Sequence, residues 1–363
     1  MKPRRFLKGG SGRHLAKTTV PFEPARLSLA RELRGLTLTE LADRVGMVPV
    51  ELSRFESGAA RPEPAALARL SLALAVPIFF FARSARSARP EGARYFRRHA
   101  VEDERIGRQQ LARVALLGDL LEFVDERVTL AKDALSSFSP AGHRPHAIEV
   151  CAQNVRRRWG LGMEPIADVT RVLEQNGILV QHLPHDADVL DAFSLRTGEF
   201  PVIFAAPSRK TAESVRFDKA HELGRLVMHQ GSAPRDPQAE AQADRFAAAF
   251  LLPARAFASE CPRSLDWDKL YRLEQRWRVA MPVLLERAFH LDCLAEPIYR
   301  RALSLWKDAG GPELETQELG WETPELLARA FELLREDWPF DRVADELSLT
   351  RVDLALVTAV SAP

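Results

Sequence analysis

The chain has 363 residues, 46% of them hydrophobic and 28% charged. It is therefore long enough for two or three folded domains, which excludes a small disulfide-stapled scaffold and a largely disordered chain. It has no run of about 18 apolar residues and no apolar segment near its basic start, so we expect neither a membrane span nor a secretory signal but a cytoplasmic protein.

The three cysteines, Cys151, Cys261 and Cys293, are far apart and form no C-x-x-C pair. An odd number of isolated cysteines argues against a disulfide framework and against a cysteine zinc site. We expect free, buried thiols.

Charge is distributed unevenly along the chain. Residues 1–100 hold 19 Lys and Arg against 8 Asp and Glu, whereas the rest of the chain holds 32 against 42. Such an asymmetry is typical of a chain whose basic end meets a polyanion, although a solvated tail also produces it. Residues 1–22 have no apolar period and are expected to form a flexible basic arm, with Lys2, Arg4, Arg5, Lys8, Arg13 and Lys17.

The segment 23–82 has a helical pattern in five short pieces. Thr37 and Glu40 form a T-x-x-E capping box at the start of the second piece, and Gly46 ends it. Pro49 suits the first turn of the third piece, three residues later. Two short helices joined by so tight a bend predict a helix-turn-helix domain.

The stretch ARELRGLTLTELADRVGMVPVELSRFESGAARPEPAALARLSLALAV resembles the phage-repressor, or XRE, type of helix-turn-helix over about residues 24–81. The resemblance implies that the third helix enters the major groove of a double-stranded DNA operator, read by a homodimer. Leu52 and Phe55 would then face the core. The residues expected to contact DNA are Arg34, Thr37, Val50, Glu51, Ser53 and Arg54.

The predicted DNA-reading face has few hydrogen-bond donors. Arg54 can bind guanine, but Glu51 can accept only from cytosine and repels phosphates. The family usually has Gln where this sequence has Leu38. Because that Gln is absent, we expect a lower affinity for the operator, whereas the fold should be unaffected. The basic arm could compensate along the DNA backbone; the alternative is a helical bundle that no longer binds DNA.

The segment 83–145 combines a basic linker, residues 83–98, with one long helix over about 105–130. Apolar residues recur on that helix at spacings of three and four, which marks one face. This face is either intramolecular core or a dimer seam, and the pattern leaves both open. Its members are Leu111, Val114, Leu117, Leu121, Val124 and Val128.

The segment 146–310 mixes helices with three strands, and we expect a small antiparallel sheet beside helices. The expected strands lie at 178–183, 192–195 and 202–205, and the expected helices at 148–159, 165–176, 214–229, 237–252, 267–277 and 282–289. The C-terminal segment, 311–363, adds two or three helices. No internal repeat is evident in the sequence.

The stretch RFDKAHELGRLVMH places His221 and Glu222 on one helix, as in the H-E-x-x-H motif that binds zinc in peptidases. The fifth position is Arg225 instead of His. On the next helix, Glu240 and Asp244 lie one turn apart. A histidine–glutamate pair alone is also compatible with a solvated helix face.

These residues, with YFRRHA, VRRRWGLGMEPIADVTRVLEQNGI, DAFSL, FPVIFAA and RWRVAMPVLLERAFHLDCL, resemble the ImmA/IrrE family of metallopeptidases over about 146–310. The resemblance implies a compact zincin-like fold of the gluzincin type, so that the whole chain is mainly α with an α+β part. It implies His221 as first zinc ligand, Glu222 as general base and Glu240 as third ligand. Asp244 would orient His221.

Arg225 breaks this ligand set, because a guanidinium stays protonated and has no lone pair to offer a metal. His229 cannot replace it, since eight residues of helix separate it from His221 by about 12 Å. Catalytic zinc normally has three protein ligands. We therefore expect no resident zinc, with zinc as the alternative, and we expect Arg225 to pair with Glu222 or Glu240 and fill the site, unless it is simply an exposed arginine.

Other candidate sites are weaker. His182 and His185, near Asp186 and Asp188, suggest a polar loop that could bind a metal. Trp277 and Trp306 are expected in the core.

These inferences predict a DNA-binding transcriptional regulator whose degenerate peptidase domain is a sensor or partner-binding module for an unknown effector. A ligand in that domain would bias the paired helix-turn-helix domains. One alternative is an active zinc endopeptidase that cleaves a transcriptional repressor. The other is a non-enzymatic interaction module without DNA binding.

Overall fold

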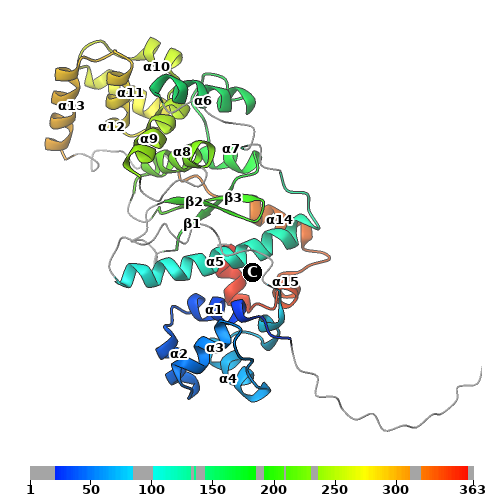
Figure 1. Ribbon diagram of the computed structural model, residues 1–363. Coiled ribbons are helices and arrows are strands. Elements are labelled where there is room, and N and C mark those ends of the chain that lie inside the picture. Colours follow the sequence, from blue (N-terminus) through cyan, green and yellow to red (C-terminus); the bar gives the residue numbers. More distant parts are fainter. Residues whose placement is uncertain are drawn as a thin grey trace, which may run out of the picture.

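The computed structural model describes residues 21–84, 101–131, 135, 144–184, 192–207, 210–229, 236–310 and 320–358, without the side chains of 101–103. Within these ranges the chain is mainly helical, with one three-stranded sheet between helical layers (Figure 1). Most of the predicted basic arm and linker, as well as His185, Asp186 and Asp188, lie outside the described residues.

The first domain contains α1 (Pro24–Leu33), α2 (Leu38–Val45), α3 (Pro49–Glu56), α4 (Pro64–Leu74) and the 3-10 helix η1 (Ile78–Ala82). The five short helical pieces predicted for this segment are present, and the fifth is a 3-10 helix. Its first bond runs from the N–H of Phe80 to the carbonyl of Pro77, only three residues back. Five residues are too few for a stable α-helical ladder, and this tighter turn buries both Phe80 and Phe81.

The capping residues of α2 are those that the sequence predicts, and Pro49 lies in the first turn of α3 as expected. The Thr37 hydroxyl accepts from the Glu40 N–H at 3.2 Å, and the Glu40 carboxylate accepts from the Thr37 N–H at 2.7 Å. Gly46 ends α2 with φ of 64°, a conformation that glycine adopts without strain. Leu52 and Phe55 are buried, which confirms that they face the core.

The sheet contains β1 (Leu179–His182), β2 (Phe193–Thr197) and β3 (Phe200–Ala205) in the order β1-β3-β2. β2 and β3 form an antiparallel hairpin, but β1 pairs with β3 in parallel. The prediction of an antiparallel sheet is therefore wrong for β1. A tight turn forces β2 and β3 to be antiparallel, whereas the longer connection from β1 leaves its direction unconstrained.

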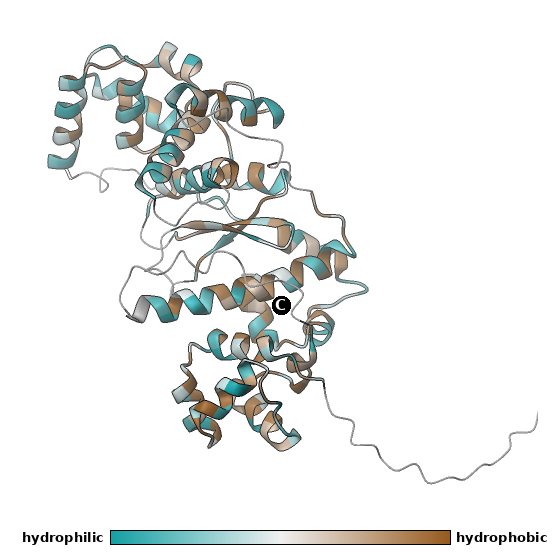
Figure 2. Ribbon diagram, in the orientation of Figure 1, coloured by the Kyte–Doolittle hydropathy of each residue, from teal (hydrophilic) through white to brown (hydrophobic). Residues whose placement is uncertain are grey.

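The sheet separates two hydrophobic cores. Leu179, Val202 and Phe204 face the core formed by α5 (Val101–Asp125) and the first domain, while Val180 and Ile203 face the core around α8. This alternation is the period of two that a strand imposes. Figure 2 shows the strands coloured as hydrophobic, as expected for a sheet covered on both sides.

The apolar face of α5 belongs to the first of these cores and not to a dimer seam. Val114, Leu117, Leu121 and Val124 are at most 1% exposed and pack beneath the sheet. The helix predicted inside the linker is therefore a structural layer that joins the sheet to the first domain (Figure 1).

The second core is built by eight helices after α5. They are α6 (Pro145–Arg158), α7 (Val169–Gln175), α8 (Ala212–Met228), α9 (Pro237–Leu251), α10 (Ala254–Glu260), α11 (Trp267–Trp277), α12 (Met281–His290) and α13 (Glu296–Asp308). α10 and α13 are not among the helices that the sequence pattern predicts. The three cysteines are free and buried, and Trp277 and Trp306 lie in the core, as predicted.

The C-terminal helices return to the first domain. They are α14 (Leu326–Leu334), α15 (Phe340–Glu346) and α16 (Arg351–Thr358), and they share the core of α1–α5. The ring of Trp338 packs edge-on against Phe123 of α5, with centroids 5.1 Å apart. Among the described residues, no helix is long and apolar enough to cross a membrane.

Candidate functional site

The candidate site lies where α8 and α9 cross. α8 is one continuous helix that begins at the Thr211 cap and carries His221, Glu222 and Arg225. Gly224 faces α9 so closely that an added Cβ would lie 2.9 Å from Cδ1 of Phe246. The missing side chain therefore lets the two helices approach until the charged groups of one reach those of the other.

His221 is held between two carboxylates of α9. Its Nδ1 lies 2.8 Å from Asp244 Oδ1 and its Nε2 lies 3.1 Å from Glu240 Oε2. Burial alone would lower the pKa of His221, but the hydrogen bonds to Asp244 and Glu240 and the charge of Glu222 outweigh it and raise the pKa to about 10. A protonated ring donates at both nitrogens, whereas a zinc ligand must offer a neutral nitrogen.

Arg225 lies inside the site and is 7% exposed. Its Nη1 donates to Glu240 Oε1, and its Nε lies 4.0 Å from Glu222 Oε2. Glu240 therefore contacts both His221 and Arg225, one with each of its two carboxylate oxygens.

Glu222 is buried and accepts a hydrogen bond of 2.6 Å from the Ser194 hydroxyl on β2. Burial raises the pKa of Glu222 to about 7, although the charges of His221 and Arg225 and the bond from Ser194 oppose this shift. Ser194 is not among the predicted site residues. Its signal in the sequence is a serine between the apolar residues Phe193 and Leu195.

The residues present do not fit a catalytic zinc ion. His221 and Glu240 can supply two ligands, but the remaining position is a guanidinium that donates to one of them. Within the described ranges, no group of three His, Cys, Asp or Glu side chains is arranged to hold a metal ion. The arrangement is instead a set of ion pairs, with the carboxylates of Glu240 and Asp244 36% and 55% exposed.

A cavity of about 480 Å³ opens beside this site between α6, α8, α9 and α12. Asp244 and Arg245 line it from α9, and Glu286 and His290 line it from α12. A ligand in this cavity would lie against Asp244, the carboxylate that holds His221.

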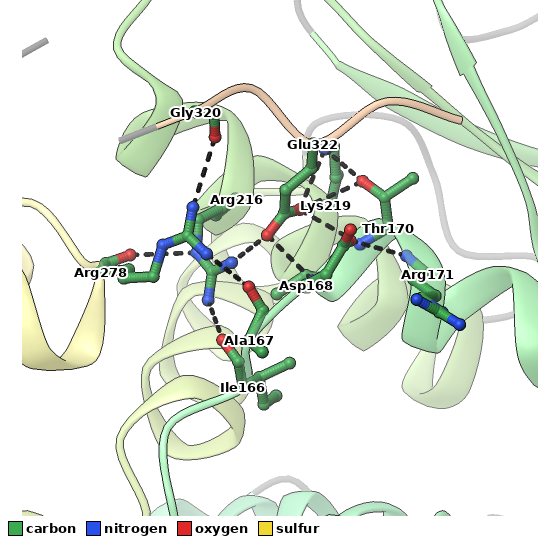
Figure 3. Close-up of polar contacts among 11 residues, drawn as sticks. Ile166, Ala167, Asp168, Thr170, Arg171, Arg216, Lys219, Arg278, Gly320 and Glu322 are labelled. Atoms are coloured by element: carbon green, nitrogen blue, oxygen red, sulfur yellow. Dashed lines mark hydrogen bonds and ion pairs between the residues drawn. The ribbon is translucent and has the colours of Figure 1, made fainter. Parts of the chain in front are cut away.

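A second charge cluster lies on the preceding turns of α8, as Figure 3 shows. The Glu322 carboxylate accepts from Lys219 Nζ at 3.3 Å, from Arg216, and from the Thr170 hydroxyl at 3.1 Å. It also accepts from the N–H groups of Val169 and Thr170. Burial alone would raise the pKa of Glu322, but the two cations and these hydrogen bonds lower it.

The outward face of α3 is open. Val50 is 70% exposed, and Glu51, Ser53 and Arg54 are exposed beside it. Thr37 is exposed as well, although its hydroxyl is engaged in the cap of α2.

Arg34 has internal partners instead. It forms a two-pronged ion pair with Asp353 at 2.6 and 2.8 Å, and its Nε donates to the Leu74 carbonyl at 2.8 Å. Its contact with DNA stays a prediction, and this pairing argues against it.

Two regions of the chain match models of known families. Residues 27–81 match the family model described as helix-turn-helix, and residues 173–289 match the one described as IrrE N-terminal-like domain, a peptidase family. The second match runs from α7 to α12 and so includes α8 and α9. No curated protein matches the chain significantly. The chain thus joins a helix-turn-helix domain of the XRE type to an ImmA/IrrE-like domain further along the same polypeptide.

Proposed function

We propose that the protein is a DNA-binding transcriptional regulator whose ImmA/IrrE-like domain has lost the peptidase chemistry and serves as a sensor or partner-binding module. We take the two domains to extend over residues 23–82 and 146–310. The observation that carries the proposal is the position of Arg225, buried between two carboxylates where the zinc motif requires a histidine.

The DNA-binding half is supported by the open face of α3. In a helix-turn-helix of this type the third helix reads base edges in the major groove. Arg54 is the exposed residue of this face that can donate two hydrogen bonds to guanine. We propose that a homodimer presents two such faces to a pseudo-palindromic operator.

The proposed sensor function is supported by the cavity beside Asp244 and by a chain of contacts that links α8 to the first domain. Lys219 and Arg216 of α8 hold Glu322, at the start of the C-terminal segment. That segment ends in α16, where Asp353 holds Arg34, the residue directly after α1. A ligand that shifts α8 would act on the DNA-binding domain through these two ion pairs, of which the first is buried and the second is partly buried.

The test is a selection of bound sequences from random duplex DNA with the full-length chain, followed by affinity measurements on the selected duplex. Arg54→Ala should weaken binding about 5- to 150-fold and relax the preference at one base pair. Arg61→Ala, an exposed arginine outside α3, is the matched control for loss of one positive charge.

The same assay tests the loss of metal chemistry. Because no metal supports the fold or the site in this proposal, treatment with a chelator should leave DNA affinity unchanged. A chain that selects no sequence would overturn the regulator proposal, and a chelator-sensitive affinity would overturn the metal-free sensor.

A further inference from the structure

Two segments of the chain, 302 positions apart, have helices that begin at the same aligned positions, although α15 ends one aligned position before α2. α2 and α3 begin at Leu38 and Pro49, while α15 and α16 begin at Phe340 and Arg351. α3 ends at Glu56 and α16 ends at Thr358, again 302 positions later. Four of the 19 aligned residues are identical, namely Ala42 and Ala344, Asp43 and Asp345, Val50 and Val352, and Leu52 and Leu354.

The two segments also bury the same positions. Leu41, Ala42 and Val45 are buried in α2, and the aligned Val343, Ala344 and Leu347 are buried in and after α15. Leu52 and Phe55 of α3 correspond to Leu354 and Val357 of α16, all four at most 5% exposed. Val50 and Val352 are both exposed, at 70% and 69%.

The turns between the helices have the same geometry. The turn residue is Gly46 with φ of 64° in the first segment and Ser348 with φ of 51° in the second. In each case the next N–H bonds back five residues, from Met47 to Ala42 and from Leu349 to Ala344, at 3.0 and 2.8 Å. The two segments thus share their helix starts, most of their buried positions and the backbone bond of the turn.

The outward faces of the two units differ. Glu51 of α3 is exposed, whereas the aligned Asp353 is 1% exposed and binds Arg34. The position of Arg54 is occupied by Leu356, which cannot donate to a base. Arg351, the one cation of α16, is paired with Asp341 at 2.9 Å.

We propose that residues 340–358 are a second helix-turn-helix unit whose recognition-position helix, α16, lies against α5 and binds Arg34, the residue that follows α1, in place of DNA. The partner of this surface is the Arg34 guanidinium, held in two hydrogen bonds by the Asp353 carboxylate. The C-terminal unit is thus an intramolecular ligand of the first domain. This inference does not depend on the first domain's own affinity for DNA.

The docking is tested by backbone hydrogen exchange of the full-length chain. In Asp353→Asn, the amides of α15 and α16 should exchange about tenfold faster or more, together with those at the end of α1, because a buried charge pair is lost. The strands β1–β3 should keep their rates. Asp341→Asn removes an exposed ion pair of the same unit and should change the rates less than about threefold.

A double-mutant cycle isolates the contact, because Arg34 also donates to the carbonyls of Leu74 and Ala75. Arg34→Gln and Asp353→Asn, alone and together, should show a coupling of about fivefold or more in the exchange of α16. Additive effects would overturn the docking of α16 on Arg34.

The helix-turn-helix geometry has its own test. Ser348→Gly should slow exchange of the unit about two- to fivefold, because glycine tolerates the positive φ that Gly46 has in the first unit. Faster exchange would show that the two turns are not equivalent.

Adding duplex DNA tests whether α16 binds within the molecule or binds DNA. We expect new protection in α3 and none in α16, whereas protection of α16 would overturn the proposal. If neither helix is protected, the regulator function fails, while the exchange results still decide the docking.

Discussion

Helix α8 carries two charge clusters that differ in their access to water. In the first, Arg216, Lys219 and Glu322 have side chains that are at most 4% exposed. In the second, His221 and Arg225 are largely buried, but Glu240 and Asp244 are 36% and 55% exposed. Both clusters hold two cations, and only the second has carboxylates that solvent or a ligand can reach.

The difference separates a structural contact from a candidate site. A buried carboxylate cannot be replaced by water, so removing its charge leaves two cations without compensation. An exposed carboxylate is hydrated when its partner is lost, so the same kind of change has a smaller effect. The closed cluster fixes the C-terminal segment, and the open cluster is where a ligand can act.

The largest effect is expected for Glu322→Gln. This change leaves Arg216 and Lys219 buried without their counter-charge, so we expect a loss of about 3–5 kcal/mol in the free energy of unfolding, measured by denaturant titration. Glu325→Gln, three residues after Glu322, removes an exposed ion pair with Arg329 and should lose less than about 1 kcal/mol. Equal losses would show that the cluster in Figure 3 is not the structural anchor.

A pH effect follows from His182, beside the closed cluster. Its Nε2 is buried and has no hydrogen-bond partner among the described residues. Burial, and then the charge of Lys219, lowers its pKa to about 4, below the usual 6.5. As pH falls from 6.5 to 4, the unfolded chain takes up a proton that the folded chain does not, so stability decreases.

At pH 5 this loss amounts to about 2 kcal/mol relative to pH 7. His182→Phe should therefore flatten the dependence of unfolding on pH between 6.5 and 4. His146→Asn, at an exposed position on α6, should leave the profile as it is. A profile that His182→Phe does not change would contradict this assignment.

Gly224→Ala tests the close approach that creates the open cluster. The added Cβ would lie 2.9 Å from Phe246, so α9 must shift, and we expect a loss of about 1–3 kcal/mol. Gly320→Ala is the matched control, because its Cβ would meet nothing within 4 Å. If both variants unfold at the same denaturant concentration as the natural chain, the packing of α8 on α9 does not constrain the site.

Arg225→Gln should have the smallest effect on folding. Glu240 can then hydrate, so we expect a loss of about 1 kcal/mol, well below that of Glu322→Gln. Arg245→Gln, on the neighbouring helix, serves as a control for charge. A loss as large as that of Glu322→Gln would mean that the two clusters of α8 do not differ in character.

The sequence predicts those parts of the fold that depend on local signals. Thr37 and Gly46 mark the ends of α2 because capping is decided within a few residues. The zinc motif likewise identifies His221, Glu222 and Arg225, since they share one helix. Glu240 and Asp244 follow from a resemblance and not from their own spacing.

The remaining features depend on contacts between distant segments. Glu322 meets Arg216 across 106 residues, and no local pattern links them. Ser194 reaches Glu222 only because β2 lies beside α8. The second helix-turn-helix is not evident in the sequence, because only four of its residues are identical to those of α2 and α3. Its similarity to them lies in which positions are buried.

The central claim is that Arg225 has replaced a zinc ligand. The most direct test is the metal content of the purified full-length chain and of Arg225→His, measured by mass spectrometry after dialysis against trace zinc, with Arg245→His as control. We expect the natural chain and the control to hold no zinc and Arg225→His to take up about one ion per chain, as three restored ligands allow. One zinc per natural chain would contradict the claim. It would favour the alternative function, a zinc endopeptidase that cleaves a transcriptional repressor.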